Sequence, residues 1–448
     1  MSDTIAAIAT AHGVASISII RLSGPEAVAI ASKIAPSAPF TPRYASLSDL
    51  LDARGELIDR GLVLYFEAPR SFTGEAVVEF QAHGGLIVAE QILESALRHG
   101  ARLAEPGEFS KRAFLNGKID LSEAEAIARL IEAKSVDAAR ILARQLKGEL
   151  GRFVEESREA LLRALAHSEV MIDYAEEDIP EELVAGLVRQ LEMLKERLED
   201  IVDSSRRRRG LIEGFRVAIV GKPNVGKSSL LNALLSYERA IVSDVAGTTR
   251  DTIEEQIRIG SHIVRLVDTA GIRDARDQIE RIGVERSLHS LEEADIVIAL
   301  FDLSRPWDME DDAILRHIER AKEAGKSVIV ALNKCDLPSV MDRSRLEPFH
   351  PIEISARRHF ERLMEALQAC LDTLATDEEL MLASTRQIEA VERCAAEIGS
   401  AMAPLEREEL ELFSYHLRAA IEAISQITRP FESEQILDRM FGEFCLGK

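Results

Sequence analysis

The octapeptide Gly221-Lys-Pro-Asn-Val-Gly-Lys-Ser228 decides the fold of the central part of the chain. It fits the phosphate-binding pattern G-x-x-x-x-G-K-[ST], and it stands between an apolar run, Phe215–Val220, and a helical pattern, Ser229–Leu235. In that setting the glycines let backbone N–H groups surround phosphates, and the helix N-terminus adds positive potential. Lys227 is expected to reach the β- and γ-phosphates and Ser228 to bind Mg²⁺. The pattern therefore predicts a P-loop nucleotide-binding domain.

Further apolar runs continue a strand–loop–helix alternation on the C-terminal side of this loop. Such alternation is typical of a parallel sheet with crossover helices. We therefore expect a Ras-like α/β domain over residues 214–372. Its remaining strand candidates are Ile263–Val267, Asp295–Phe301, Ser327–Leu332 and Pro351–Ile354.

Three further motifs indicate which nucleotide binds. In Asp268-Thr-Ala-Gly271, the Asp can hold Mg²⁺ through water, and the Gly lets a backbone N–H approach the γ-phosphate. In Asn333-Lys-Cys-Asp336, the Asp can accept from two N–H donors that guanine presents and adenine lacks. Ser355-Ala356 is expected to close the base pocket at the next strand end. The set indicates GTP and resembles the translation-factor-like GTPase superfamily.

A candidate switch, Ser243-Asp-Val-Ala-Gly-Thr-Thr-Arg-Asp251, lies between the phosphate loop and D-T-A-G. Its Thr249 is placed to bind Mg²⁺ while the γ-phosphate is present. Ile272, directly after D-T-A-G, cannot orient water, and Glu280 is a candidate for that task; a solvated helix glutamate is the alternative interpretation. Asn224 and the Gly-Thr-Thr switch are features of potassium-activated GTPases, in which K⁺ takes the place of an arginine finger.

The regions on either side of this domain differ from it in pattern. Residues 1–118 mix short apolar runs with turn residues and a helical pattern over Leu86–His99, which predicts a small α/β or α+β domain. Residues 119–213 and 373–448 carry apolar residues at three- and four-residue spacing, typical of amphipathic helices. We interpret them as one helical domain into which the α/β domain is inserted. The Arg206–Arg209 run is either a cationic helix end or an RNA-facing patch.

Composition narrows the function classes. The 448 residues suggest roughly three domains, and the net charge of −22 excludes a basic nucleic-acid coat over the whole chain. Residues 4–20 carry no Asp, Glu, Lys or Arg, but they lack the basic flank of a signal peptide, and Val14–Ile20 largely alternates like a strand. No stretch has the length and apolarity of a membrane span, so we expect a cytoplasmic protein. The cysteines show no zinc or disulfide spacing: Cys335, Cys370, Cys394 and Cys445.

The flanking domains indicate which GTPase family the chain resembles. The ending Met440-Phe-Gly-Glu-Phe-Cys-Leu-Gly-Lys448 resembles the Phe-Cys-(Ile/Leu)-Gly-Lys terminus of the MnmE/TrmE tRNA-modification GTPases. Asp244–Asp251 and Asp268–Gly283 are similar to the middle of that family. Four segments resemble its N-terminal domain, namely Ser71-Phe-Thr-Gly-Glu75, His83-Gly-Gly85, Glu105-Pro-Gly-Glu-Phe109 and Arg112-Ala-Phe-Leu-Asn116. The resemblance covers the whole chain in the same order.

This resemblance implies an N-terminal domain, residues 1–118, that binds a tetrahydrofolate derivative (5-formyl- or 5,10-methylene-tetrahydrofolate) and forms a homodimer. It also implies a heterotetramer with an FAD-dependent partner, MnmG. Together the two install an aminomethyl or carboxymethylaminomethyl group at C5 of the wobble uridine of certain tRNAs. The folate supplies the one-carbon unit, and GTP hydrolysis on K⁺-dependent dimerisation of the GTPase domains drives the cycle.

The resemblance carries these roles to particular residues. Glu280 matches the catalytic glutamate. The folate contacts are Arg21, Glu79, Lys118 and Lys448. The ligands of K⁺ are Asn224, Ser243, Val245 and Thr248, and those of Mg²⁺ are Ser228 and Thr249. The GTP-binding set is Asn224, Val225, Gly226, Lys227, Ser228, Ser229, Ser243, Asp244, Val245, Ala246, Gly247, Thr248, Thr249, Asp268, Thr269, Ala270, Gly271, Asn333, Lys334, Asp336, Ser355 and Ala356.

The terminal segment carries two further expectations. Lys448 can act as a folate ligand only if the C-terminus folds back onto the N-terminal domain, where Arg21, Glu79 and Lys118 lie. Cys445 is either a reactive thiolate near the one-carbon donor or a small buried residue that packs the tail.

Two other function classes fit parts of the chain. A ribosome-assembly GTPase shares the phosphate loop and switch, but normally carries a basic RNA-binding module that a chain of net charge −22 does not show. The other class is an interaction protein with a vestigial GTPase. It is opposed by four intact residues of the nucleotide motifs: Lys227, Thr249, Asp268 and Asp336.

Overall fold

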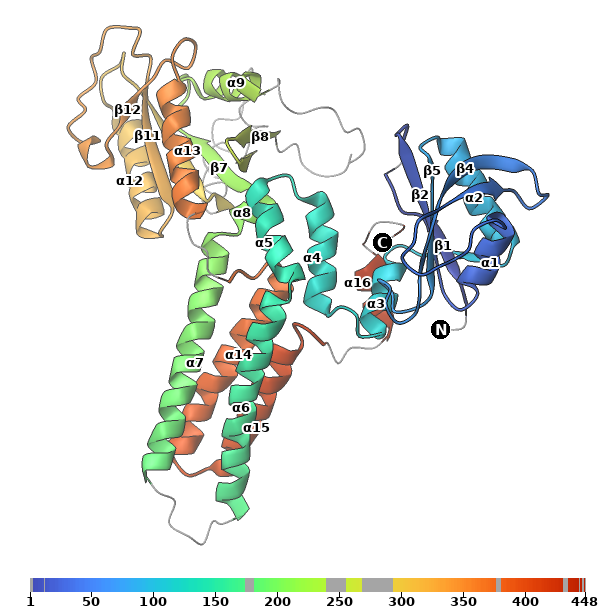
Figure 1. Ribbon diagram of the computed structural model, residues 1–448. Coiled ribbons are helices and arrows are strands. Elements are labelled where there is room, and N and C mark those ends of the chain that lie inside the picture. Colours follow the sequence, from blue (N-terminus) through green and yellow to red (C-terminus); the bar gives the residue numbers. More distant parts are fainter. Residues whose placement is uncertain are drawn as a thin grey trace. The chain divides into compact units, whose positions relative to one another are not determined.

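A computed structural model describes residues 3–11, 13–173, 181–238, 255–267, 293–375, 380–429, 434–442, 444 and 447 (Figure 1). Its contacts divide the chain into two compact units. The first unit consists of Met1–Ile131, Arg144–Leu191 and Ala396–Lys448, and the second of Glu132–Ala143 and Glu192–Ala395. The domain boundaries at residues 118, 213 and 372 stay a prediction.

A six-stranded sheet opens the first unit, in the order β3-β4-β5-β2-β1-β6. Neighbouring strands are antiparallel, except that β1 and β6 are parallel. The apolar runs of the sequence lie in β4 and β5, whereas β2 begins three residues after the predicted start at Val14 and β3 was missed. The strands are β1 (Ile5–Ile8), β2 (Ile17–Ser23), β3 (Ser46–Leu51), β4 (Leu57–Phe66), β5 (Val77–His83) and β6 (Arg102–Leu103).

The two faces of this sheet carry different chemistry because successive side chains of a strand point to opposite sides. On one face, Ile20 and Leu22 pack into a core with helices α1 (Ala27–Ile34) and α2 (Leu86–Arg98). On the other face, Ile5 and Ala7 pack against Phe109 of helix α3 (Glu108–Leu115). The alternation therefore places the polar residues Arg21 and Ser23 of β2 on the α3 face.

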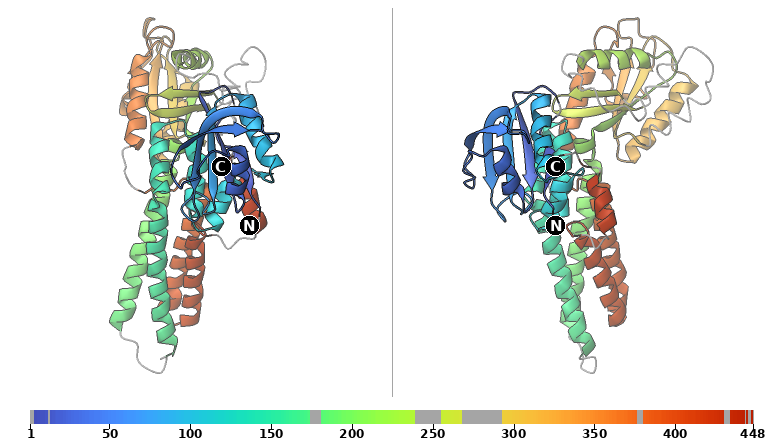
Figure 2. Two further views of the ribbon diagram at one scale, coloured as in Figure 1. Left: turned by 45° about the vertical axis from the view of Figure 1, so that its right-hand side comes forward. Right: turned by 90° about the vertical axis from the view of Figure 1, so that its right-hand side faces the viewer.

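Long helices make up the rest of the first unit. Helices α6 (Glu149–Asp173) and α15 (Leu410–Ser425) lie side by side (Figure 2), and the buried hydroxyls of Ser168 and Ser414 are 2.8 Å apart between them. Within the described ranges, no helix is both long enough and apolar enough to cross a bilayer. The cytoplasmic compartment stays a prediction. Helices α4 (Leu121–Glu132) and α16 (Glu434–Gly442) also belong to this unit, apart from the last residue of α4. Three further helices have residues in both units: α5 (Val136–Leu146), α7 (Glu181–Arg207) and α14 (Thr385–Glu406).

The C-terminal segment folds back onto the N-terminal sheet, as the sequence predicts. Helix α16 packs on α3, where Lys111 forms an ion pair with Asp438. Gly447, at φ +90°, lies so close to β1 that an added Cβ would be 2.4 Å from the Ile8 carbonyl oxygen. Lys448 and Cys445 lie outside the described residues.

A second six-stranded sheet forms the centre of the second unit, in the order β12-β11-β10-β7-β9-β8. The predicted parallel arrangement is confirmed for five strands; the edge strand β8, which the sequence analysis missed, is antiparallel to β9. The elements are α8 (Gly210–Glu213), β7 (Phe215–Val220), α9 (Lys227–Glu238), β8 (Glu255–Ile259), β9 (His262–Val267), β10 (Ile296–Asp302), α12 (Met309–Glu323), β11 (Ser327–Asn333), β12 (Ile352–Glu353) and α13 (Glu361–Ala375).

Helices cover both faces of this sheet, as burial of a parallel sheet requires. Residues of α9 and α13 pack with Ile219 and Ile298 on one face. Residues of α12 pack with Val220 and Val297 on the other face. Strand β10 is consequently buried along its whole length.

Ser261 of the β8–β9 turn and His262, the first residue of β9, contact two helices within the second unit. Buried His262 lies between two carboxylates: its Nε2 is 2.8 Å from Asp372 Oδ1 of α13, and its Nδ1 is 3.4 Å from Asp137 Oδ2 of α5. The Ser261 hydroxyl also donates to Asp137, at 3.0 Å. Polar contacts thus join α5 to the strand hairpin.

Truncating Phe413 of α15 should destabilise the helical part of the first unit, because the side chain is fully buried. We expect Phe413→Ala to lower the free energy of unfolding by about 3–5 kcal/mol. Tyr415→Ala is the matched control, since Tyr415 is 65% exposed on the same helix and its loss should cost at most about 0.5 kcal/mol. Urea denaturation followed by circular dichroism measures both; equal losses would contradict the assignment of the buried face.

Candidate functional sites

The phosphate loop lies at the carboxyl end of β7, where the strand order of the second sheet reverses. Strand β7 lies between β10 and β9, and the loop Gly221–Ser228 leads from it into α9. In open α/β sheets, ligands bind at this kind of switch point, outside the carboxyl ends of the strands. The predicted placement of the loop between a strand and a helix is therefore confirmed.

The side chain of Asn333 ties the phosphate loop to the predicted base-binding loop. Its buried amide nitrogen donates to the Val225 carbonyl at 2.7 Å, and its amide oxygen accepts from the Ala356 backbone N–H at 2.9 Å. Gly226, at φ +112°, has no room for a side chain, because an added Cβ would be 2.2 Å from the Asn333 amide nitrogen. Three motifs that are far apart in sequence thus meet at one carboxamide.

Two lysines complete this edge of the sheet. Lys334 Nζ donates to the Asn224 carbonyl at 3.1 Å and to Asp302 Oδ2 at 2.6 Å. Burial alone would raise the pKa of Asp302, but hydrogen bonds from Lys334 and Ser304 bring it below its ordinary value. Lys227 Nζ donates to the Gly221 and Lys222 carbonyls at 2.6 and 3.0 Å, so its ammonium group lies against the loop backbone.

Lys222, which was not predicted to have a role, joins the phosphate loop to helix α12. This buried residue of the phosphate loop donates to Asp308 at 2.7 Å and to Asp311 at 2.6 Å, at the N-terminus of α12. Burial favours a lower pKa, but the two carboxylates raise the pKa of the Lys222 ammonium above its ordinary value. The Asp308-x-x-Asp311 spacing allows a helix cap to be predicted from the sequence. The pairing of Asp308 with Lys222, 86 positions away, cannot be predicted in this way.

The structure describes eleven residues of the predicted GTP set: Asn224, Val225, Gly226, Lys227, Ser228, Ser229, Asn333, Lys334, Asp336, Ser355 and Ala356. They belong to the phosphate loop and to the loops after β11 and β12, which the Asn333 and Lys334 contacts bring together. The other predicted nucleotide, metal and catalytic residues lie outside the described part of the chain: Ser243, Asp244, Val245, Ala246, Gly247, Thr248, Thr249, Asp268, Thr269, Ala270, Gly271 and Glu280.

Three predicted folate contacts lie in the N-terminal sheet domain. Arg21 and Glu79 face each other across β2 and β5, with Arg21 Nε 2.8 Å from Glu79 Oε1. The Arg21 guanidinium carbon lies 5.9 Å from the ring centre of Phe72 and 5.6 Å from that of Phe109. Lys118 borders the same loop as Phe72, because a Cβ added to Gly74 would be 3.1 Å from Lys118 Cε.

The arginine run at the end of α7 is engaged within the protein. Arg206 pairs with Glu392, Arg208 donates to the Ser204 carbonyl at 3.3 Å, and Arg209 pairs with Glu213 at 2.8 Å. Arg206 and Arg207 form the last turn of the helix. These contacts favour the cationic helix end over an RNA-facing patch.

Comparison with known proteins places the chain in a family. The family described as GTP-binding protein TrmE N-terminus matches residues 4–118, and the MnmE helical domain family matches residues 121–445. This chain belongs to the MnmE family of tRNA modification GTPases. The resemblance and the multidomain fold class predicted from the sequence are thereby confirmed, and this MnmE-family protein is a GTP-hydrolysing enzyme of tRNA modification.

Curated relatives match the MnmE-family chain over its whole length. The tRNA modification GTPase MnmE of Sulfurovum sp. (strain NBC37-1) is 63% identical over 448 residues, all of this chain and 99% of that protein. The protein of the same name from Sulfurimonas denitrificans is 59% identical over 446 residues, again 100% of this chain and 99% of the relative. A crystal structure of Era with MgGDPNP and nucleotides 1506–1542 of 16S ribosomal RNA is 29% identical over 41% of this chain and 66% of that chain; its TM-score is 0.26, too low to establish a shared fold.

Replacing Gly226 by Ala should disrupt the nucleotide site. The new methyl group would collide with the Asn333 amide at a backbone angle that side chains rarely adopt. We expect GTP affinity to fall at least about tenfold. Titration with a fluorescent GTP analogue measures this, with Gly186→Ala as the control because that position has open space. Unchanged affinity of the Gly226→Ala protein would contradict the proposed packing.

Proposed function

We propose that this protein, with an FAD-dependent MnmG-type partner, adds an aminomethyl or carboxymethylaminomethyl group at C5 of the wobble uridine of certain tRNAs. The observation that supports the proposal most is the 63% identity to a tRNA modification GTPase over 100% of the chain. The ordered phosphate and base loops support a GTP-hydrolysing role within that reaction.

The proposed nucleotide chemistry assigns tasks to residues of the phosphate and base loops and to predicted residues outside the described part of the chain. The loop N–H groups and Lys227 bind the phosphates, Ser228 and Thr249 hold Mg²⁺, and Asp336 selects guanine. The donor set fits these groups, since hydroxyls suit Mg²⁺ and an exposed carboxylate suits the N–H edge of guanine. Asn224, Ser243, Val245 and Thr248 hold K⁺, and Glu280 orients the attacking water. The bound ions supply charge neutralisation as the phosphate bond breaks.

The proposed folate site fits the residues that the structure brings together. Arg21 and Lys118 are cations suited to an anionic glutamate tail, and the Glu79 carboxylate suits the N–H donors of a pterin edge. Gly447 lies against the Ile8 carbonyl, one register position from Ala7, the β1 partner of Arg21. Lys448, which lies outside the described residues, is the fourth proposed folate contact. The folate, when bound, supplies the one-carbon unit.

The assembly that we propose follows from the same family. The protein forms a homodimer through the 1–118 domain and a heterotetramer with its flavoprotein partner in the cytoplasm. The helical domain comprises residues 119–213 and 373–448, and the GTPase domain comprises residues 214–372. Substrate tRNA binds to this complex.

Mass analysis of wobble uridines tests the proposed function. Deletion of the gene should remove the C5 aminomethyl or carboxymethylaminomethyl group from the affected tRNAs, and the wild-type gene should restore it. Lys227→Ala should fail to restore it, because GTP binding or turnover is lost. Intact wobble modification together with defective ribosome assembly in the deletion strain would favour a ribosome-assembly GTPase instead.

GTP hydrolysis should depend on K⁺. We expect at least about tenfold faster turnover in KCl than in NaCl at equal ionic strength, because a cation at Asn224 and the Gly-Thr-Thr switch would take the place of an arginine finger. Asn224→Ala should abolish the difference between the two salts. Steady-state phosphate release measures both proteins; equal rates of the wild type in KCl and NaCl would refute the potassium site.

A further inference from the structure

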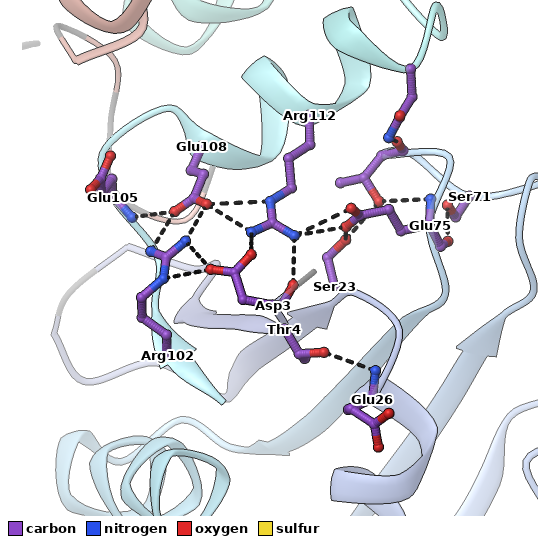
Figure 3. A network of polar contacts seen from close by, with 12 residues as sticks. Asp3, Thr4, Ser23, Glu26, Ser71, Glu75, Arg102, Glu105, Glu108 and Arg112 are labelled. Carbon is purple, nitrogen blue, oxygen red and sulfur yellow. Dashed lines mark hydrogen bonds and ion pairs between the residues drawn. The ribbon is translucent and has the colours of Figure 1, made fainter. Parts of the chain in front are cut away.

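A buried arginine forms the centre of a polar cluster on the α3 face of the N-terminal sheet. Figure 3 shows the Arg112 guanidinium between the carboxylates of Asp3, Glu75 and Glu108. Its side chain is 0% exposed. A buried guanidinium is tolerated only when its N–H groups are paired, so the position of each partner matters.

Each nitrogen of the Arg112 guanidinium has a partner. Nη1 donates to the Asp3 carbonyl at 3.0 Å and to both Glu75 carboxylate oxygens, at 3.2 and 3.1 Å. Nη2 donates to Asp3 Oδ1 at 3.0 Å and to Glu108 Oε1 at 2.9 Å, and Nε donates to the same oxygen at 3.3 Å. Arg112 thereby joins the N-terminal segment, helix α3 and the loop that ends at Glu75.

Glu75 transfers this anchoring to the loop Ser71–Glu75. Its carboxylate also accepts from the Ser23 hydroxyl at 2.7 Å, and that hydroxyl is 2.7 Å from the buried Thr73 hydroxyl. The Ser71 hydroxyl donates to the Glu75 carbonyl at 2.5 Å, and Asn116 Nδ2 donates to the Thr73 carbonyl at 2.7 Å. The loop is therefore fixed by polar contacts at both ends and in its middle.

The Ser71–Glu75 loop lies beside Arg21 and Lys118, two of the three predicted folate contacts that the structure describes. Phe72 lies under the Arg21 guanidinium, and Gly74 packs against the Lys118 side chain. Arg21 in turn pairs with the third candidate, Glu79. None of these three residues is among the hydrogen-bond partners of Arg112, so it acts on them indirectly, through the loop and through helix α3, whose Phe109 also lies against Arg21.

We propose that Arg112 is a positioning residue of the folate site, which holds the Ser71–Glu75 loop in the shape that sets Arg21 and Lys118 for folate binding. This inference rests on the proposed folate function. A lysine cannot replace the arginine, because a single ammonium cannot reach three carboxylates that a planar guanidinium bridges.

Arg102 provides a matched control for the alternative that Arg112 only stabilises the fold. It donates to Glu108 at 2.7 and 3.0 Å and to Asp3 at 2.9 Å, so it shares two carboxylates with Arg112. Its contacts do not include Glu75, and its side chain is 44% exposed. A change at Arg102 therefore perturbs the same cluster without releasing the loop.

The test measures binding of 5-formyl-tetrahydrofolate to the full-length protein by calorimetry, together with amide hydrogen exchange. We expect Arg112→Lys and Glu75→Gln each to raise the Kd about tenfold, and the amides of residues 71–76 to exchange faster. Arg102→Lys should leave the Kd and the loop exchange near wild-type values. In reconstituted tRNA modification, Arg112→Lys should raise the KM for folate more than it lowers kcat, because Arg112 touches no reacting group.

Each failure has a distinct signature. If the wild type does not bind 5-formyl-tetrahydrofolate, or Arg21→Ala binds it as tightly as the wild type, the proposed folate site itself is wrong. If the wild type binds but Glu75→Gln and Arg112→Lys bind equally well, the positioning role is wrong. If all three cluster variants lose affinity in parallel with their melting temperatures, Arg112 serves only the fold. If Arg112→Lys does not fold, the Kd and loop exchange of the nearly isosteric Glu75→Gln protein test the positioning role instead.

Discussion

One carboxamide, that of Asn333, holds together the loops on which the nucleotide site depends. A parallel sheet gathers the carboxyl ends of its strands at one edge, but it leaves the loops that follow free to take many shapes. By donating to the Val225 carbonyl and accepting from the Ala356 amide, this side chain fixes the separation of the phosphate and base loops. Only glycine fits beside it at position 226, so the backbone itself forms the wall of the site.

In the N-terminal domain, hydrogen bonds between charged side chains likewise fix loops and helices in place. Its sheet buries an apolar core against α1 and α2, and it uses the opposite face for charge. Three carboxylates and two arginines there are stable only because their hydrogen bonds are nearly complete. The polar face thereby gains the rigidity that a hydrophobic core supplies elsewhere.

The sequence allows the strands beside the phosphate loop to be predicted, because burial on both faces makes them continuous apolar runs. Strand β7 has the predicted bounds, Phe215–Val220. Strand β3 was missed because its serines point inward while Leu47 is exposed, which inverts the usual pattern. The motifs predict the nucleotide residues, but the contacts of Lys222 with α12 and of Arg112 with Asp3 and Glu75 join positions 37 to 109 residues apart, which no local pattern records.

The contact between Asp3 and Arg112 also bears on how the protein is synthesised. The two residues are 109 positions apart and lie near the two ends of the N-terminal domain. The chain leaves the ribosome from its first residue onward. The carboxylates of Asp3, Glu75 and Glu108 therefore emerge before Arg112, which pairs with all three. The domain therefore completes its polar centre late, and its long-range pairing favours slow folding after most of the domain has left the ribosome.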